Sequence, residues 1–430
     1  MSIVLGDYCY MMPPKRRKYC RSLPPDVLSD LPDNVIDVIL MCLPCKDVVR
    51  TSILSKKWRY HWCRLTKLTL DSSLWVTKKD LLNPTVKFTK IIYQLLSLHE
   101  GPITKFTLNI GFLENCPDIG NFISFLSRKD IQHLVLDLSW KMLYKLPSSL
   151  FTCSQLRHLT LRNCLIHPPS AFQGFDMLTS LELRNVKISS VLLESLISRC
   201  PVLKRLILNI PEILSIIEIN APMLRSFNFR GDISFICLKN VPLLVKVSLA
   251  GDDMRAENLD FAKVFESCSA LEHLRLDFSN TMFYDDYNEA PTRLPFVLNS
   301  VKRFYLPHIM LIDSYKLSFA LFLIRSFPCL EYLEIQVDNE DSGYEESLEL
   351  KHLSNVTFNH LREVKIELCT GSTSEMQLIK LLLANSPVLV RMLIDRQFLD
   401  DEPLDTRLQV FAEISKFSHA SPKAEVVYVD

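Results

Sequence analysis

The chain has 430 residues, 48% of them hydrophobic, and its 49 Lys and Arg residues balance 49 Asp and Glu residues. This length and composition are typical of a folded protein with a large core, and zero formal net charge does not indicate a polyanion binder by bulk charge. No run approaches the roughly 18 apolar residues of a membrane-spanning helix. The 13 cysteines stand in apolar contexts, so reduced thiols are expected rather than a disulfide framework.

Residues 1–25 are expected to form a flexible basic leader. Its basic cluster follows the apolar residues, opposite to the order in a secretory signal, so we place the protein inside the cell. The cluster is the run Lys15, Arg16, Arg17 and Lys18. Nuclear import receptors recognise basic runs of this kind, but a solvated charge cluster explains the run equally well. The protein is therefore expected in the nucleus, the cytoplasm or both.

Residues 26–64 are predicted to form three short helices that carry an apolar stripe. Pro32 pre-sets the first turn of the first helix, and Asp47 can cap the second. Ser55 can cap the third, which places Trp58 and Trp62 one turn apart on one face. A segment of this size is too small to bury so much apolar surface internally.

This segment resembles the F-box at nearly every position that defines that domain. The matching residues are Leu31, Pro32, Ile36, Ile39, Leu40, Leu43, Pro44, Lys46, Asp47, Val49, Arg50, Ser52, Leu54, Ser55, Lys56, Trp58 and Arg59. The resemblance implies docking onto a Skp-type adaptor, and through it onto cullin and RING subunits. The apolar stripe and Trp58 would then be buried by the partner rather than by this chain alone. An ordinary three-helix cap on the following domain is the alternative.

The resemblance also implies which side chains contact the adaptor. These residues are all apolar and lie on or between the three predicted helices. They are Leu31, Pro32, Ile36, Ile39, Leu40, Leu43, Pro44, Val48, Val49, Leu54 and Trp58.

From residue 65 to residue 357 the pattern L-x-x-L-x-L recurs, at the spacing of leucine-rich repeats. Each unit predicts a short strand with one buried face, and no unit can bury that face alone. The units must therefore stack into a curved solenoid with a parallel sheet on its inner face. Asn163 and Asn185 each follow a strand leucine by two residues, where an asparagine can bond turn backbone along the stack. A doubly wound enzyme is disfavoured because only 9 glycines are present and no Gly-rich turn is found.

Residues 358–430 are predicted to run strand, helix, strand, helix and strand. This order resembles the FBD region at the end of many plant F-box proteins with leucine-rich repeats. In any case the region is expected to cap the last apolar edge of the solenoid. Together these patterns predict an α/β solenoid: a small N-terminal helical F-box, a leucine-rich-repeat horseshoe with a parallel sheet, and a C-terminal FBD-like cap.

Motifs of common catalytic sites are missing from the sequence: it has no H-E-x-x-H, G-x-S-x-G, P-loop or G-x-G-x-x-G pattern. We therefore expect no catalytic residue, cofactor or metal. Cys42 and Cys45 form a C-x-x-C pair, but they lie at a helix junction, which favours packing over redox or zinc chemistry. His133, His158 and His273 each precede a strand leucine, which indicates a surface on the sheet rather than a metal cluster.

Function is then expected on protein-binding surfaces. Two long spacers between repeats, one around Tyr284 and one around Tyr344, combine aromatic and acidic residues. Such residues would suit a basic partner segment, although flexible acidic loops are the simpler interpretation. Outward-facing strand positions form a second, more basic candidate surface. It contains Arg157, His158, Thr160, Arg162, Glu182, Arg184, Lys204 and Arg205. The candidate substrate-binding residues from the two surfaces are Phe283, Tyr284, Tyr287, Tyr344, Arg162 and Arg184.

Two hypotheses for function follow. In the first, the chain is the non-catalytic substrate-recognition subunit of a Skp-cullin-F-box E3 ubiquitin ligase: the F-box docks the adaptor, and the repeats hold a protein target near the recruited enzyme. In the second, it is a leucine-rich-repeat scaffold or ligand sensor acting outside a ligase. A receptor ectodomain is disfavoured because no signal peptide or membrane span is found. Neither a membrane nor a nucleic-acid partner is expected.

Overall fold

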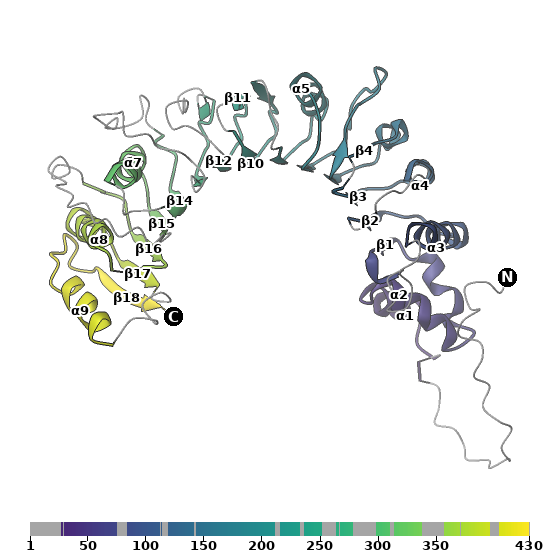
Figure 1. Ribbon diagram of the computed structural model, residues 1–430, viewed down its shortest axis with the longest axis horizontal. Coiled ribbons are helices and arrows are strands. Elements are labelled where there is room, and N and C mark those ends of the chain that lie inside the picture. The colour runs from purple at the N-terminus through teal and green to yellow at the C-terminus, as the bar shows by residue number, and fades with distance from the viewer. Residues whose placement is uncertain are drawn as a thin grey trace, which may run out of the picture.

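The protein is an arch of stacked repeats in which one open parallel sheet lines the inner face and helices lie on the outer side (Figure 1). The computed structural model describes residues 27–28, 30–74, 84–111, 113, 119–141, 143–210, 216–232, 236–251, 264–265, 267–277, 298–309, 314–337, 357–369, 371–395 and 404–429. The predicted solenoid with a helical N-terminal unit is confirmed.

Among the described residues, the inner sheet has 14 strands, and their spatial order follows the chain order. They are β1 (Lys67–Leu70), β2 (Lys105–Asn109), β3 (His133–Asp137), β5 (His158–Arg162), β7 (Ser180–Arg184), β8 (Arg205–Asn209), β10 (Ser226–Gly231), β12 (Lys246–Gly251), β13 (His273–Asp277), β14 (Arg303–Ile309), β15 (Tyr332–Val337), β16 (Glu363–Glu367), β17 (Arg391–Asp395) and β18 (Glu425–Val429). Each strand pairs in parallel with the next, so each repeat adds one strand to the sheet.

The remaining elements precede the sheet or lie on its outer side (Figure 1). The helices are α1 (Asp33–Met41), α2 (Cys45–Arg50), the 3₁₀ helices η1 (Thr51–Ile53), η2 (Trp58–Arg64), η3 (Ser72–Leu74) and η4 (Ser148–Thr152), α3 (Pro84–Leu98), α4 (Ile119–Leu126), α5 (Ser190–Ser198), α7 (Ser314–Arg325), α8 (Thr373–Asn385) and α9 (Leu404–Ile414). Two small parallel sheets pair β4 (Tyr144–Lys145) with β6 (Cys164–Leu165) and β9 (Ile217–Asn220) with β11 (Ile236–Asn240).

The core is built from strand leucines that stand side by side in neighbouring repeats. Leu134, Leu159, Leu181 and Leu206 occupy one register position on four successive strands, and all are buried. The alternating pattern places these side chains beneath the sheet and the intervening residues on the concave face. Stacking is therefore what buries each repeat.

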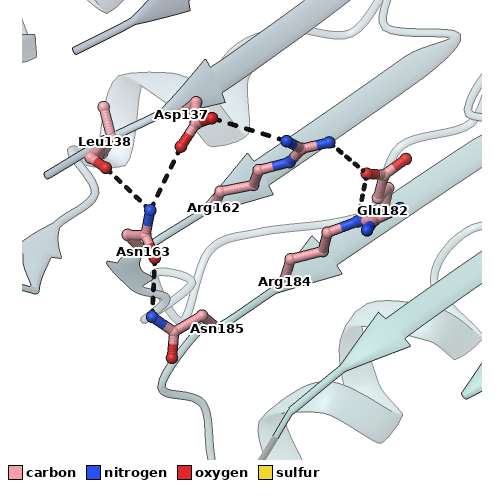
Figure 2. Close-up of polar contacts among 7 residues, drawn as sticks. All are labelled: Asp137, Leu138, Arg162, Asn163, Glu182, Arg184 and Asn185. Atoms are coloured by element: carbon pink, nitrogen blue, oxygen red, sulfur yellow. Dashed lines mark hydrogen bonds and ion pairs between the residues drawn. The ribbon is translucent and has the colours of Figure 1, made fainter. Parts of the chain in front are cut away.

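An asparagine ladder links the turns that follow the strands (Figure 2). The Asn163 side-chain amide donates to the Leu138 carbonyl at 2.9 Å and to Asp137 Oδ1 at 3.3 Å, and its Oδ1 accepts from Asn185 Nδ2 at 2.7 Å. Both asparagines have positive φ, 57° and 48°, a conformation that asparagine tolerates better than most residues. The predicted bond to turn backbone is confirmed for Asn163, whereas Asn185 bonds the side chain of Asn163 instead.

The N-terminal helices are joined to the solenoid by a shared core. Trp58 and Trp62 belong to the same buried cluster as Leu68 and Leu70 of β1. The Cys63 carbonyl accepts the Glu100 amide at 3.0 Å, and the Leu65 carbonyl accepts His99 Nε2 at 2.8 Å. The helical unit thus seals the first edge of the array as well as preceding it.

The helix starts in this unit agree only partly with prediction. The Ser55 hydroxyl accepts the Trp58 amide at 3.4 Å, but the helix that follows is 3₁₀ and its N-cap residue is Lys57 rather than Ser55. The prediction that Asp47 caps the second helix is wrong. That helix begins at Cys45, directly after Pro44, and Asp47 lies inside its first turn, where it pairs with Arg50 at 3.2 Å.

At the other end, β16, α8, β17, α9 and β18 follow the predicted order of elements. A capping box opens α8: the Ser372 hydroxyl accepts the Glu375 amide, while the Glu375 carboxylate accepts the amides of Gly371 and Ser372. Helix α9 contacts the last strand through the rings of Phe411 and Tyr428, whose centroids are 4.2 Å apart. The last strand and its helix therefore cover the edge of β17.

Replacing Asn163 by alanine should lower the free energy of unfolding by about 2–4 kcal/mol. The loss combines three side-chain hydrogen bonds at about 1 kcal/mol each with the strain of a positive φ in alanine. Asn163→Gly is the matched control, because glycine adopts this φ freely and should recover about 1 kcal/mol. Urea unfolding followed by circular dichroism measures the difference, and an unchanged midpoint in the alanine variant would contradict a structural role for the ladder.

Replacing Gly371 by alanine should destabilise the C-terminal cap by about 1–3 kcal/mol. Gly371 has a φ of 81°, and an added Cβ would lie 2.7 Å from Val410 Cγ2 on α9. Hydrogen exchange at the amides of β18 should accelerate. A second substitution, Val410→Ala, makes room for the methyl group and should restore part of the protection. Unchanged exchange in the single variant would show that α9 does not depend on this close approach.

Candidate partner-binding surfaces

Helix α1 exposes one apolar face while it buries another. Ile36 and Leu40, one turn apart, are fully buried against the core. Val35, Val38 and Met41 lie on the opposite side and are exposed, with Val38 at 56% near the centre of that side. A short helix that is apolar on both sides has one side left for a partner.

Further exposed apolar residues follow α1 in the F-box region. Ile53 is 73% exposed and Leu54 is 55% exposed at the end of η1, and Leu43 and Pro44 are exposed in the turn between α1 and α2. We call this set the F-box outer surface. It comprises Pro32, Val35, Val38, Met41, Leu43, Pro44, Ile53 and Leu54.

The expectation that the apolar stripe and Trp58 wait for a partner to bury them is corrected by the structure. Ile36, Leu40, Val48 and Trp58 are already buried by this chain, Trp58 to 3% exposure, because the solenoid supplies the core that the short segment lacks. These four side chains support the F-box outer surface from beneath. Leu31, Ile39 and Val49 are partly buried against the same core.

Sequence reasoning included Val35 in the apolar stripe but missed Val38, Met41 and Ile53 as candidates for contact. The available signal was the apolar residues on both sides of α1, since a helix at the end of a solenoid needs only one apolar side for its own core. The pattern could not tell which side the solenoid covers.

Polar contacts hold the F-box helices together. The Trp58 indole donates to the Leu28 carbonyl at 3.0 Å. The buried His61 imidazole lies 3.1 Å from Asp37 and 3.7 Å from Asp33, and Lys57 lies 3.6 Å from Asp33. Because these contacts join α1 to η2, the outer surface is presented by a fixed scaffold rather than by a loose helix.

On the concave face, Arg162 and Arg184 form part of an ion-pair network (Figure 2). Arg162 lies 3.6 Å from Asp137 and 3.0 Å from Glu182, and Arg184 Nε lies 2.7 Å from Glu182. Both guanidinium groups are part-exposed, but neighbouring carboxylates offset their charges. Their role in binding a target stays a prediction. Phe283, Tyr284, Tyr287 and Tyr344, with both acidic spacers, lie outside the described residues.

The histidines of the strands lie on the sheet surface, as predicted. The rings of His133 and His158 stack across neighbouring strands, with centroids 4.3 Å apart and planes 10° apart. Burial and the neighbouring cations lower the pKa of both imidazoles, and the pKa of His273 is lowered for the same reasons. Because neighbouring cations such as Lys105 and Arg157 contribute to these shifts, the positive charge at this side of the concave face comes from the lysines and arginines around the histidines.

The two cysteines of the C-x-x-C pattern lie at the junction of α1 and α2. Cys42 is exposed, and Cys45 is partly buried. Burial, and to a lesser extent Asp71, raises the pKa of Cys45 to about 11, which is opposite to the shift of a reactive thiol. Across the described ranges, no group of three or more His, Cys, Asp or Glu side chains is placed to hold a metal ion. Within those ranges, too, no helix has the length and apolar character needed to span a membrane.

Comparison with known proteins identifies two regions of the chain. Residues 28–69 match the F-box domain family, and residues 119–335 match the repeats of the family described as FBD-associated F-box protein At5g56370, LRR repeats. The chain is 31% identical over 418 residues to the Arabidopsis thaliana F-box/FBD/LRR-repeat protein At1g13570, covering 94% of this chain and 99% of that protein.

Two further relatives from Arabidopsis thaliana match about half of the chain. FBD-associated F-box protein At5g22730 is 35% identical over 208 residues, covering 46% of this chain and 42% of its own length. F-box/FBD/LRR-repeat protein At5g56420 is 32% identical over 222 residues, covering 48% and 51%. Because the chain is 31% identical to At1g13570 over nearly the whole length of both proteins, it belongs to the plant family of F-box/FBD/leucine-rich-repeat proteins.

Proposed function

We propose that this protein is the substrate-recognition subunit of a Skp-cullin-F-box ubiquitin ligase. F-box domains generally bind Skp-type adaptors, and the observation that carries the proposal is the exposed apolar face of α1 on a folded F-box. The adaptor would bury Val38 and its neighbours, and cullin and RING subunits would join through the adaptor. The protein would act in the nucleus, the cytoplasm or both.

The fold supports a mechanism based on proximity. The F-box shares one core with the first repeats, so a target held on the sheet keeps a defined position relative to the adaptor. A ligase complex gains rate when acceptor lysines are held near the loaded conjugating enzyme, because an encounter in solution becomes a local reaction. This chain would contribute binding and geometry, and the recruited enzyme would perform the chemistry.

The sharpest test changes the outer face of α1 without touching the core. Val38→Glu places a charge at the centre of the exposed side and should weaken binding of the full chain to a plant Skp-type adaptor by about 30-fold or more, since a central contact contributes about 2 kcal/mol. Isothermal titration calorimetry with purified adaptor measures the affinity.

Val191→Glu is the matched control. Like Val38, Val191 is an exposed valine on a nine-residue helix: it is 74% exposed on α5 in the repeats. Its variant should bind the adaptor like the wild type. Equal affinity of both variants and wild type would show that α1 is not the docking face, and no binding by the intact chain would favour a scaffold acting outside a ligase.

A further inference from the structure

At the end of the concave face where the strands begin, every strand of the inner sheet from β1 to β12 except β7 carries at least one basic residue. This end is formed by the first residue of each strand and the residue before it. In the sheet order these positions are Thr66, Lys67, Thr104, Lys105, Gln132, His133, Arg157, His158, Thr179, Ser180, Lys204, Arg205, Arg225, Ser226, Val245 and Lys246. None of these positions carries a carboxylate.

We call the basic members of this set the basic stripe. They are Lys67, Lys105, His133, Arg157, His158, Lys204, Arg205, Arg225 and Lys246. The lysines and arginines among them are exposed, and both histidines are at least partly exposed. In the described part of the chain, no carboxylate lies within ion-pair distance of any member.

The middle and the far end of the strands in the same sheet differ in charge. There Asp137, Glu182 and Asp277 lie beside arginines, so positive and negative charges offset each other. The stripe ends at β12, because the residue before β13 is Glu272, which pairs at 2.9 Å with Lys302, the residue before β14. A chain whose formal net charge is zero has therefore concentrated unpaired positive charge along one narrow track.

The dimensions of the basic stripe favour an extended acidic peptide over a nucleic-acid duplex as its ligand. The stripe is two residues wide, and the carboxylates of Asp137 and Glu182 lie only two to four residues further along the strands, about 7–13 Å away. A nucleic-acid duplex would bring its phosphates close to those carboxylates, which would repel them, whereas an extended peptide is narrow enough to lie on the basic stripe alone. Seven inter-strand steps separate β1 from β12 in the sheet order, or about 34 Å, which is the length of about ten extended residues.

We propose that the basic stripe binds an acidic segment of the target protein, in extended conformation across the strands from β1 to β12. This proposal rests on the proposed function, since the bound segment would be the recognised part of the target. Glu or Asp side chains, or phosphorylated residues in the same segment, would pair with exposed Lys and Arg side chains. The concave face would thus select its partner by charge before any finer contact.

The first test uses the full chain without adaptor and a fluorescein-labelled peptide of ten glutamates. Fluorescence anisotropy should show binding that weakens as salt rises. The triple variant Lys204→Gln, Arg205→Gln, Arg225→Gln should weaken peptide binding about tenfold or more, because three pairs at about 0.5–1 kcal/mol each are lost.

The control variant removes the same number of positive charges from exposed sites away from the stripe: Lys145→Gln, Lys187→Gln and Lys416→Gln. It should bind the peptide within twofold of the wild type. Equal losses in both variants, or no peptide binding by the wild type, overturn the proposal. Tighter, stripe-dependent binding of a ten-residue oligothymidine would assign the track to nucleic acid and overturn it too.

Adaptor binding separates this proposal from the proposed function. Both triple variants should bind the adaptor with wild-type affinity, because the stripe lies outside the F-box outer surface. A chain that binds the peptide but not the adaptor would refute only the ligase role.

A pH series gives a readout that a purely structural role would not produce. Burial, then the neighbouring charges, lowers the pKa of His133 and His158 in the free protein. The groups that face the pair are each other's rings, Lys67 on β1, Lys105 on β2, Arg157 before β5 and Arg205 on β8. A bound carboxylate favours the imidazolium form and raises both pKa values, so binding takes up protons.

Peptide affinity should therefore rise about three- to tenfold between pH 7.5 and pH 5.5, while the glutamates, with an ordinary pKa of about 4.3, stay mostly charged. The double variant His133→Gln, His158→Gln should lose most of this rise and keep its affinity at pH 7.5. Affinity that is independent of pH in the wild type would place the peptide elsewhere.

Discussion

Every part of this molecule depends on stacking, because no repeat can bury its own leucines. The column formed by Leu134, Leu159 and Leu181 is buried only because neighbouring strands lie in register. The same requirement fixes both ends of the arch. The F-box supplies Trp58 and Trp62 to the first edge, and β18 with α9 covers the last. The N-terminal unit is therefore a cap and a candidate docking domain at once.

Much of the fold could be predicted because its signals are local. The L-x-x-L-x-L pattern places each strand, and Asn163 and Asn185 mark turns that need both a positive φ and a side-chain amide. The C-terminal run of strands and helices is equally local. The prediction that Asp47 caps α2 is wrong because the helix starts directly after Pro44, without a side-chain cap.

The candidate surfaces were harder to predict because they depend on residues distant in sequence. Whether Val38 or Ile36 faces outward depends on where the solenoid packs, and α1 is apolar on both sides. The arginines at 162 and 184 read as free charges in the sequence, yet Asp137 and Glu182 meet them only through the register of adjacent strands. Register likewise assembles the basic stripe from separate repeats.

These features give the protein two surfaces of different chemical character at separate places on one fold. The F-box outer surface is apolar, which suits a stable docking contact. The basic stripe is charged and exposed, which suits selection and rapid encounter. A shared core connects them, so the arch would hold a target at a set distance from the adaptor.

The most direct test of this division is hydrogen exchange of the full chain with and without a plant Skp-type adaptor. Protection should appear in residues 33–54, and the strands from β5 to β12 should exchange as in the free protein. Protection along those strands, or none in the F-box, would contradict the account.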